Sequence, residues 1–345
     1  MACFSGDLTH NIGCCSMMLE IQSVLEFLAA VLIFPGFLSA FVGALLNQWY
    51  MRKVFARMQN RVGPRYVGPF GILQPFYDFC KLLSKESITP KYGRAKLYAL
   101  FIGLGIGSNI VTLMFLPFSP FRLHSSSDIV IFVYLGLWST IAFAFASLMI
   151  PNLFPSIGVS RLISLMFVYE PTWVLSILTP VVIVSKYGGG LSFSVLETVE
   201  KFSVILSNPL YLVLTAISFV AAIISLQCKL GLQPFDIFEA DSEILAGVYT
   251  EFSGAKLALA SLFHDLEAFT GAILVVFIFL GGSLPFSLYT VEGILLAILK
   301  FLVVVFLMTA IKASSARYRL DQAIVFFFKY PLLLSLASLV IATFV

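Results

Sequence analysis

Eight long apolar segments dominate this sequence of 345 residues and decide what it can fold into. A helix needs about 20 mostly apolar residues to cross a hydrocarbon layer of roughly 30 Å. Lipid offers peptide groups no hydrogen-bond partners, so each segment should be a helix, in which these groups bond to one another. The expected fold class is therefore all-α, a polytopic membrane protein with about eight transmembrane helices. The predicted spans are about 24–46, 97–117, 129–150, 160–185, 209–227, 257–281, 291–312 and 324–344.

The composition excludes the water-soluble classes of protein. Apolar residues make up 60% of the chain and charged residues only 11%, whereas soluble domains carry about 25% charged residues. So few charges could not cover a surface in water, which argues against a soluble enzyme, a nucleic-acid binder and a disordered chain. The five cysteines include no C-x-x-C pair. We therefore expect neither an iron–sulfur cluster nor a zinc site in this chain.

Positive charges are distributed unequally between the two sides of the predicted bundle. Most of the 21 Lys and Arg residues lie in loops that share one side, at 47–96, at 228–256 (which includes Lys229) and after the seventh span. The opposite loops hold Arg122, Lys186 and Lys201. Cytoplasmic loops carry such an excess. We therefore expect a multi-pass protein of the cell membrane with both termini on the outer side.

The N-terminal stretch before the first span carries little structural information. Residues 1–17 contain no Lys or Arg and so lack the basic region of a signal peptide. We expect residues 1–23 to be a poorly ordered extension and residues 24–345 to form a single membrane domain.

The first long loop predicts two interfacial amphipathic helices. Arg57 and Arg61, four residues apart, share one face of the first helix, which Gly-Pro at 63–64 would end. A second helix is predicted at 73–84 and carries Asp78 and Lys81. One explanation of these charges is cytoplasmic topology together with contact with lipid headgroups. The alternative is a shaped docking surface, which is favoured by the Gln, Asn and Asp residues and the Gly-Pro turns among the charges.

A second loop is acidic, although it lies on the otherwise basic side. Its carboxylates are Asp236, Glu239, Asp241, Glu243 and Glu251. Membrane topology does not require acidic residues, so their presence in this loop needs another explanation. One explanation is ion pairing with the basic loop. A second is a hydrated vestibule in which crowded carboxylates pass protons. Metal binding is disfavoured because the loop offers no His and no second cluster.

Charged residues also fall inside the spans. Arg161 and Glu170 are nine residues apart, about 2.5 turns, so they lie on opposite sides of one helix about 13 Å apart along its axis. Each therefore needs its own partner or water, because an unpaired charge at such depth is costly. His264, between the acidic loop and Glu267, is interpreted as a structural contact rather than a proton shuttle.

Four motifs, in the same order along the chain, resemble the subunit 1 family of respiratory complex I. They are Arg57-x-Gln59-x-Arg61-x-Gly63-Pro64 with the following Val67-Gly68-Pro69-x-Gly71-x-Leu73-Gln74-Pro75; Ser160-Arg161 with Tyr169-Glu170; Pro234-Phe235-Asp236-x-x-Glu239-Ala240-Asp241-Ser242-Glu243; and Ala316-Arg317-Tyr318-Arg319-Leu320-Asp321-Gln322. The resemblance covers about residues 20–345.

The resemblance implies a membrane subunit without a redox centre, and with no cofactor, metal or catalytic residue of its own. It would dock a peripheral arm of cluster-bearing, hydrogenase-like subunits on the cytoplasmic side, and couple their redox chemistry to ion movement towards antiporter-like membrane subunits. Iron–sulfur clusters, and in a hydrogenase a NiFe centre, would lie in the partners; lipid is the other partner. An ion path would consist of Glu170, Asp236, Glu239, Asp241, Glu243 and Glu251, with Arg161 as a charged partner. The docking surface would include Arg57, Gln59, Arg61, Asp78, Lys81, Arg317 and Arg319.

Three departures from the complex I pattern bear on whether this chain helps to form a quinone-binding cavity. Leu232-Gln233 stands where complex I members have an Arg at the quinone cavity, Met51 replaces a Glu, and Ala316 replaces a Pro. These features resemble the archaeal membrane-bound [NiFe] hydrogenases and ferredoxin-dependent sulfane sulfur reductases, which lack a quinone reaction. The complete Val-Gly-Pro loop is more typical of complex I. We expect the hydrogenase or sulfane reductase branch.

Two alternatives remain. A quinone- or methanophenazine-site subunit would use Phe70, Phe235 and Phe238 as lining residues. A standalone secondary transporter would show two related halves, but residues 1–170 and 171–345 show no repeat, and the basic loop has no counterpart.

Overall fold

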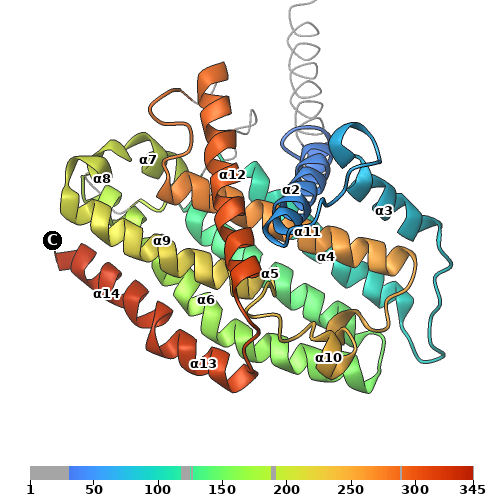
Figure 1. Cartoon of the computed structure of the whole chain (residues 1–345). Helices are drawn as coiled ribbons and strands as arrows, with labels where there is room; N and C mark the ends of the chain where they lie inside the picture. The colour runs from blue at the N-terminus through green and yellow to red at the C-terminus, as the bar shows by residue number, and fades with distance from the viewer. Residues whose placement is uncertain (1–30, 118–124, 126, 188–191, 288–289, 345) are drawn as a thin grey trace, which may run out of the picture.

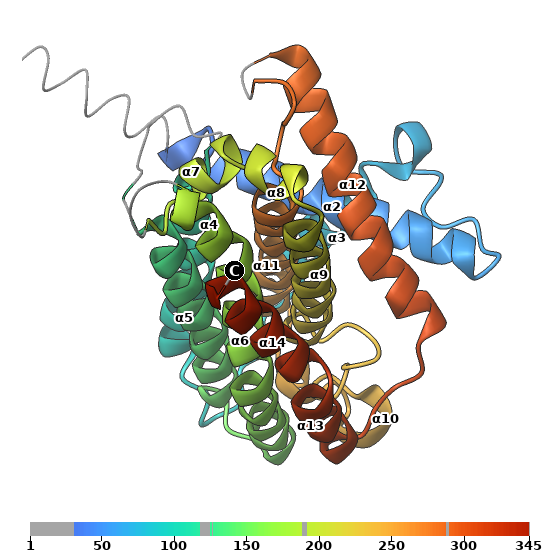
Figure 2. The ribbon, with the colours of Figure 1, turned by 90° about the vertical axis from the view of Figure 1, so that its left-hand side faces the viewer.

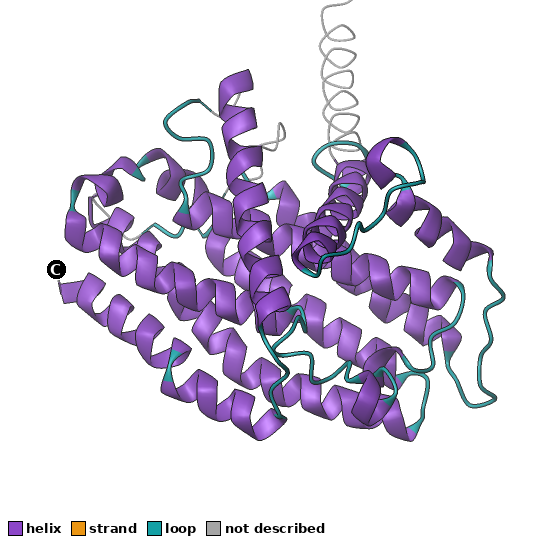
Figure 3. Cartoon of the chain, viewed as in Figure 1, coloured by secondary structure: helices purple, strands orange, loops and turns teal. Residues whose placement is uncertain are grey.

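The structure is a computed structural model that describes residues 31–117, 125, 127–187, 192–287 and 290–344, without the side chain of Asp241. Every regular element in this part of the chain is a helix, which confirms the all-α fold class (Figure 3). Seven helices are long and apolar enough to cross a membrane. They are α4 (Ala95–Met114), α5 (Asp128–Leu148), α6 (Leu153–Tyr187), α9 (Pro209–Lys229), α11 (Ala255–Phe279), α12 (Val291–Ser314) and the pair α13 (Leu320–Lys329) and α14 (Pro331–Phe344).

These seven match the last seven predicted spans. The predicted extension at 1–23 lies outside the described residues, and so does much of the first predicted span at 24–46. The last span is interrupted at Tyr330, because Pro331 has no N–H to donate to the preceding turn. Two short helices, α7 (Val195–Glu200) and α8 (Ser203–Ser207), occupy a connection in which no helix was expected.

The first interfacial helix was predicted wrongly. Residues 52–58 instead continue a single helix, α2 (Phe37–Met58), which also includes the end of the first predicted span. No Gly or Pro stands between 44 and 62 to break it, and it ends before the Gly-Pro pair at 63–64. The second interfacial helix is confirmed as α3 (Gln74–Ser84), which follows the short 3-10 turn η1 (Pro69–Gly71).

The long helices form a bundle in which α4, α5, α6, α9 and α11 run side by side, whereas α2 and α12 cross them steeply (Figures 1 and 2). Helix α11 is the most deeply buried of the seven. Helices α13 and α14 pack along α6 and α9. The polar side chains of α11 therefore face other helices rather than lipid.

Four segments distant in sequence meet at one end of the bundle, along the right and lower side of Figure 1. Backbone bonds join them: Tyr318 N donates to Pro234 O (2.9 Å) and Arg94 N to Met149 O (2.9 Å). Ile88 N donates to Ser253 Oγ (2.8 Å). We call this end the loop face, comprising residues 59–94, 149–152, 230–254 and 315–319. The basic first loop and the acidic loop do share one side.

Candidate functional site

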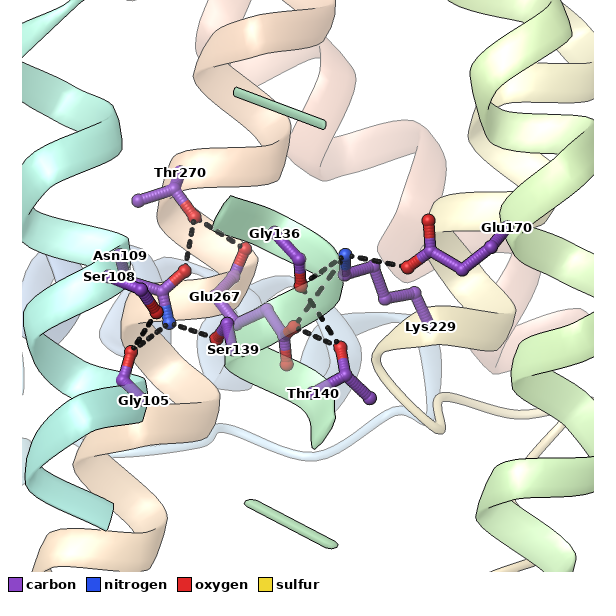
Figure 4. Close-up of polar contacts among 10 residues, drawn as sticks. All are labelled: Gly105, Ser108, Asn109, Gly136, Ser139, Thr140, Glu170, Lys229, Glu267 and Thr270. Carbon is purple, nitrogen blue, oxygen red and sulfur yellow. Dashed lines mark hydrogen bonds and ion pairs between the residues drawn. The ribbon is translucent and has the colours of Figure 1, made fainter. Parts of the chain in front are cut away.

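A buried lysine lies between two buried carboxylates in the middle of the bundle (Figure 4). Lys229 Nζ is 3.1 Å from Glu170 Oε1 on α6 and 3.9 Å from Glu267 Oε1 on α11. It also donates to Gly136 O on α5 at 3.1 Å. All three charged residues are at most 7% exposed. We call Glu170, Lys229 and Glu267 the buried cluster, since each charge has an opposite charge to offset its lost hydration.

Local structure explains why the ammonium group fits there. Lys229 is the last residue of α9, and the negative end of a helix dipole favours a cation. Gly136 leaves the required space: a Cβ added at this position would lie 3.2 Å from Lys229 Nζ. The carbonyl of Gly136 can therefore approach the ammonium directly.

Polar groups continue from the buried cluster across α5 to α4 (Figure 4). Thr140 donates to Glu267 Oε1 (3.1 Å). Thr270 donates to Asn109 Oδ1 (3.5 Å), and Asn109 Nδ2 donates to Ser139 Oγ (2.8 Å). Lys229, Glu267, Asn109 and Thr270 also border a cavity of about 20 Å³, enough for one water molecule. A proton could thus be relayed beyond the three charged residues.

Glu239 brings the acidic loop into the protein interior. Its Oε1 is buried and has no hydrogen-bond partner among the described residues. Burial raises the pKa of Glu239 to about 7, against the opposing effects of His264 and of a hydrogen bond with Tyr249; Asp236 adds to the rise. A carboxyl group with a pKa near 7 can take up and release a proton at physiological pH.

Tyr249, in the 3-10 turn η2 (Gly247–Tyr249), connects this carboxyl group with the helices. Burial raises its pKa well above the ordinary value, and the nearby carboxylates of Glu239, Glu267 and Asp265 raise it further. Its hydroxyl is therefore neutral and can both donate and accept a hydrogen bond. We call Glu239, Tyr249, His264 and Asp265 the entrance cluster. His264 Nε2 lies 2.8 Å from Leu230 O, and Nδ1 is 3.9 Å from Asp265 Oδ1.

The other predicted path carboxylates lie at the rim of the loop face. Glu243 forms an ion pair with Arg161, which also donates to Ile237 O (3.3 Å). Asn152 donates to Glu251, and the Asp236 carboxylate pairs with Arg317. The side chain of Asp241, in the short helix α10 (Asp241–Ile244), lies outside the described residues.

Arg161 and Glu170 do not pair with each other, in agreement with their nine-residue spacing. Arg161 binds Glu243 at the loop face, and Glu170 binds Lys229 inside the bundle. Lys229, interpreted from sequence as a loop charge that sets topology, is instead a buried partner. The signal that could have found it is its position at the end of an apolar span, followed by apolar Leu230 and Leu232 rather than by polar loop residues.

The predicted docking residues divide into two groups. Arg57, Gln59, Arg61, Lys81 and Arg319 are exposed, and Arg61 donates to Gln59. Asp78 and Arg317 instead hold the chain together. Asp78 accepts from Arg52 of α2 (2.7 Å) and from Gln74 of α3 (2.8 Å), whereas Arg317 pairs with Asp236.

The candidate quinone-lining residues do not gather at one place. Phe235 and Phe238 are only 2% and 3% exposed, and Phe235 packs against Phe327 and Tyr318. Phe70 is 75% exposed on the loop face. Within the described part of the chain, no group of three or more His, Cys, Asp or Glu residues could hold a metal ion.

The fold and the site define a class: helical, membrane-embedded subunits with charged groups inside the bundle and polar loops gathered at one end. The sequence profile described as NADH dehydrogenase matches residues 29–343. The chain belongs to this family, whose members include the subunit 1 chains of NADH dehydrogenase, as the four motifs indicated.

Two relatives are the H-type subunits of bacterial NADH-quinone oxidoreductases. That of Dehalococcoides mccartyi (strain CBDB1) is 32% identical over 334 residues, covering 93% of this chain and 87% of that protein. That of Brevibacillus brevis (strain 47) is 31% identical over 330 residues, covering 94% of both. A chain of the membrane-bound sulfane sulfur reductase, an archaeal respiratory membrane complex, superposes with a TM-score of 0.77 at 26% identity, covering 92% of this chain and 99% of that one. Both branches considered from sequence are thus among the relatives.

Proposed function

We propose that this chain is the membrane anchor and energy-coupling subunit of a complex-I-related, ion-translocating oxidoreductase. In this proposal the loop face is cytoplasmic and docks a peripheral redox arm. Ions pass from the entrance cluster to the buried cluster and on to antiporter-like membrane subunits. Iron–sulfur clusters, and any NiFe centre, belong to the partner subunits.

One observation carries the coupling role: ionisable side chains continue from the loop face into the bundle. Glu239 has a pKa of about 7 and a hydrogen bond with Tyr249, which lies near Glu267. Glu267 in turn lies 3.9 Å from Lys229, which binds Glu170. Charged groups at such depth cost at least about 2.5 kcal/mol each and usually line an ion pathway or pair with one another. The order of these groups from loop to core supports a pathway, and the pairing of Lys229 with Glu170 and Glu267 lowers the cost of their burial.

The docking role rests on the exposed face of the first loop. Arg57, Arg61 and Lys81 are exposed there, together with Tyr66 (95%) and Phe70 (75%). Aromatic and Arg side chains are enriched at protein interfaces. Phe70 is held firmly, because Trp49 Nε1 and Lys53 Nζ both donate to its carbonyl, at 3.2 and 2.7 Å. An exposed aromatic residue on a fixed main chain, beside basic residues, suits a permanent partner.

The sulfane reductase or hydrogenase branch is the better supported one. The close packing of Phe235 and Phe238 leaves these two side chains no role in lining a quinone chamber, and a sulfane sulfur reductase chain shares the fold over 92% of this chain. The two NADH-quinone oxidoreductase relatives favour the alternative, a quinone- or methanophenazine-site subunit. Copurified quinone, or loss of electron transfer on adding a quinone-site inhibitor to the intact complex, would establish the alternative.

The coupling role is tested in the intact complex reconstituted into liposomes. Glu170→Gln should lower the number of ions moved per electron at least fivefold and leave the subunit composition on a native gel unchanged. Glu292→Gln, at the exposed start of α12, is the matched control and should change neither. Unchanged coupling in Glu170→Gln would contradict the proposal. The chain expressed alone should show neither ion flux nor redox activity, and flux from it alone would favour a transporter.

A further inference from the structure

Oxygen atoms from three helices surround the position of Lys229 Nζ inside the bundle. Glu170 Oε1 of α6 and Gly136 O of α5 lie 3.1 Å from this position, and Glu267 Oε1 of α11 lies 3.9 Å from it. Thr140 Oγ1 adjoins, 3.1 Å from Glu267 Oε1. Main-chain carbonyls and other oxygen ligands also hold Na⁺ in membrane transporters and divalent cations in other proteins. The oxygen cage formed by these four residues has the chemistry of a cation site.

The ammonium group of Lys229, a cation that is part of the chain, lies at the centre of this cage. The Lys229 side chain is only 7% exposed. A tethered group acts at an effective concentration in the millimolar range or above and cannot diffuse away. A free Na⁺ would have to displace the ammonium from two carboxylates in a region of low dielectric, where both attractions are strong.

We propose that the buried cluster conducts protons and excludes Na⁺, because the ammonium of Lys229 takes the place that Na⁺ would need. The inference rests on the proposed ion path and names the ion that this subunit carries. A proton, unlike Na⁺, needs no vacant cage. It binds to a carboxylate oxygen, where one O–H bond forms, and leaves from the same oxygen when that bond breaks.

The cluster has the charge and the free acceptor that this step requires. Two carboxylates and one ammonium carry a net charge of −1 when all are ionised, so one bound proton makes the cluster neutral. Glu170 Oε2 is buried and has no hydrogen-bond partner among the described residues, which leaves a lone pair available. The adjoining cavity of about 20 Å³ has room for one water molecule that could deliver the proton.

The test measures binding of ²²Na⁺ to the intact, detergent-solubilised complex. Lys229→Ala removes the tethered cation and should gain one ²²Na⁺ site per complex over the wild type. Lys229→Arg keeps a tethered cation and should gain none. Comparing variants with the wild type subtracts any sodium sites on other subunits. No gained site in an assembled Lys229→Ala complex would overturn the inference.

A second measurement uses the wild-type complex alone, in case Lys229→Ala fails to assemble. A density map at high Na⁺ should show the ammonium still bonded to Glu170. Density for a cation in the cage, with Lys229 turned away, would overturn the inference.

Failure of this inference is distinguishable from failure of the proposed function. If Glu170→Gln abolishes coupling but Lys229→Ala gains no sodium site, the ion path stands and the exclusion of Na⁺ is wrong. If Lys229→Ala gains the site but Glu170→Gln leaves coupling unchanged, the exclusion of Na⁺ stands, and the path and the conduction of protons through the cluster are contradicted.

Discussion

The side chains of Glu239 and Tyr249 lie next to each other where the acidic loop meets the long helices, and each shifts the pKa of the other. Glu239 lies in a turn of that loop, and Tyr249 ends the 3-10 turn that follows it. Because Tyr249 also lies near Glu267, its hydroxyl is the connection between the entrance cluster and the buried cluster.

Tyr249→Phe should therefore slow proton transfer without disturbing packing. The ring contacts of Tyr249 with Phe143 and Phe252 do not need the hydroxyl. We expect redox-driven proton uptake by the reconstituted complex to fall roughly tenfold, within the usual range for one proton-transfer group. Tyr66→Phe, at a side chain that is 95% exposed, is the control. Equal uptake in the two variants would show that Tyr249 does not take part.

The raised pKa of Glu239 predicts a pH dependence of stability. Its folded value of about 7 exceeds the value of about 4.3 expected in an unfolded chain, so between these values the folded protein binds the proton more tightly. The free energy of unfolding should fall as the pH rises from about 4.5 to about 7, by at most about 1.4 kcal/mol per pH unit, and level off above.

Melting temperatures of the intact complex between pH 5 and 8 test this dependence. In Glu239→Gln, which cannot ionise, the melting temperature should decline less over that range than in the wild type. If the melting temperature changes with pH in the same way in both proteins, the pH dependence does not come from Glu239.

The Arg161–Glu243 pair predicts a coupling between two substitutions. Both side chains are partly exposed, at 24% and 48%, and such pairs contribute about 0.2–1 kcal/mol. Glu243→Arg alone should weaken the attachment of the acidic loop to α6, and the reversed pair Arg161→Glu/Glu243→Arg should restore it. Hydrogen exchange of residues 240–246 reports the attachment. If the double variant exchanges faster than either single variant, the pair does not fasten the loop.

Charge reversal at Arg57 and Arg61 should release the peripheral arm. Both guanidinium groups are exposed on the proposed docking surface, and attraction between exposed charges weakens as salt screens it. Washing membranes at increasing salt should remove the peripheral subunits from Arg57→Glu/Arg61→Glu at lower ionic strength than from the wild type. Lys186→Glu, at an exposed position near the far end of α6, is the control. The same salt profile for all three proteins would contradict docking at this surface.

Hydropathy alone placed seven helices to within a few residues at most boundaries, because lipid forces apolar segments of sufficient length into helices. For α9 the predicted span 209–227 became Pro209–Lys229, and for α11 257–281 became Ala255–Phe279. Helix α6 begins seven residues before its predicted start at 160, because Pro155, Ser156 and Gly158 interrupt the apolar run in its first two turns.

The pairing of charges could not be predicted in the same way. Asp236 and Arg317 are 81 residues apart, and Glu170 and Lys229 are 59 apart. No local pattern encodes such contacts, since they depend on how the helices pack. The spacing of Arg161 and Glu170 predicted only that they would not meet, and the structure supplies the partner of each.

Helix α6 spans 35 residues, about 52 Å at 1.5 Å per residue, which exceeds the roughly 30 Å hydrocarbon layer. It carries Arg161 at the loop face and, about 13 Å further along, Glu170 in the buried cluster. A tilt of roughly 5° about the Arg161 end would swing Glu170 sideways by about 1 Å over that lever arm. That displacement is comparable to the difference between the 3.1 and 3.9 Å separations of Lys229 from its two carboxylates. A tilt of α6 that small would therefore be enough to change which of the two carboxylates lies nearer to Lys229.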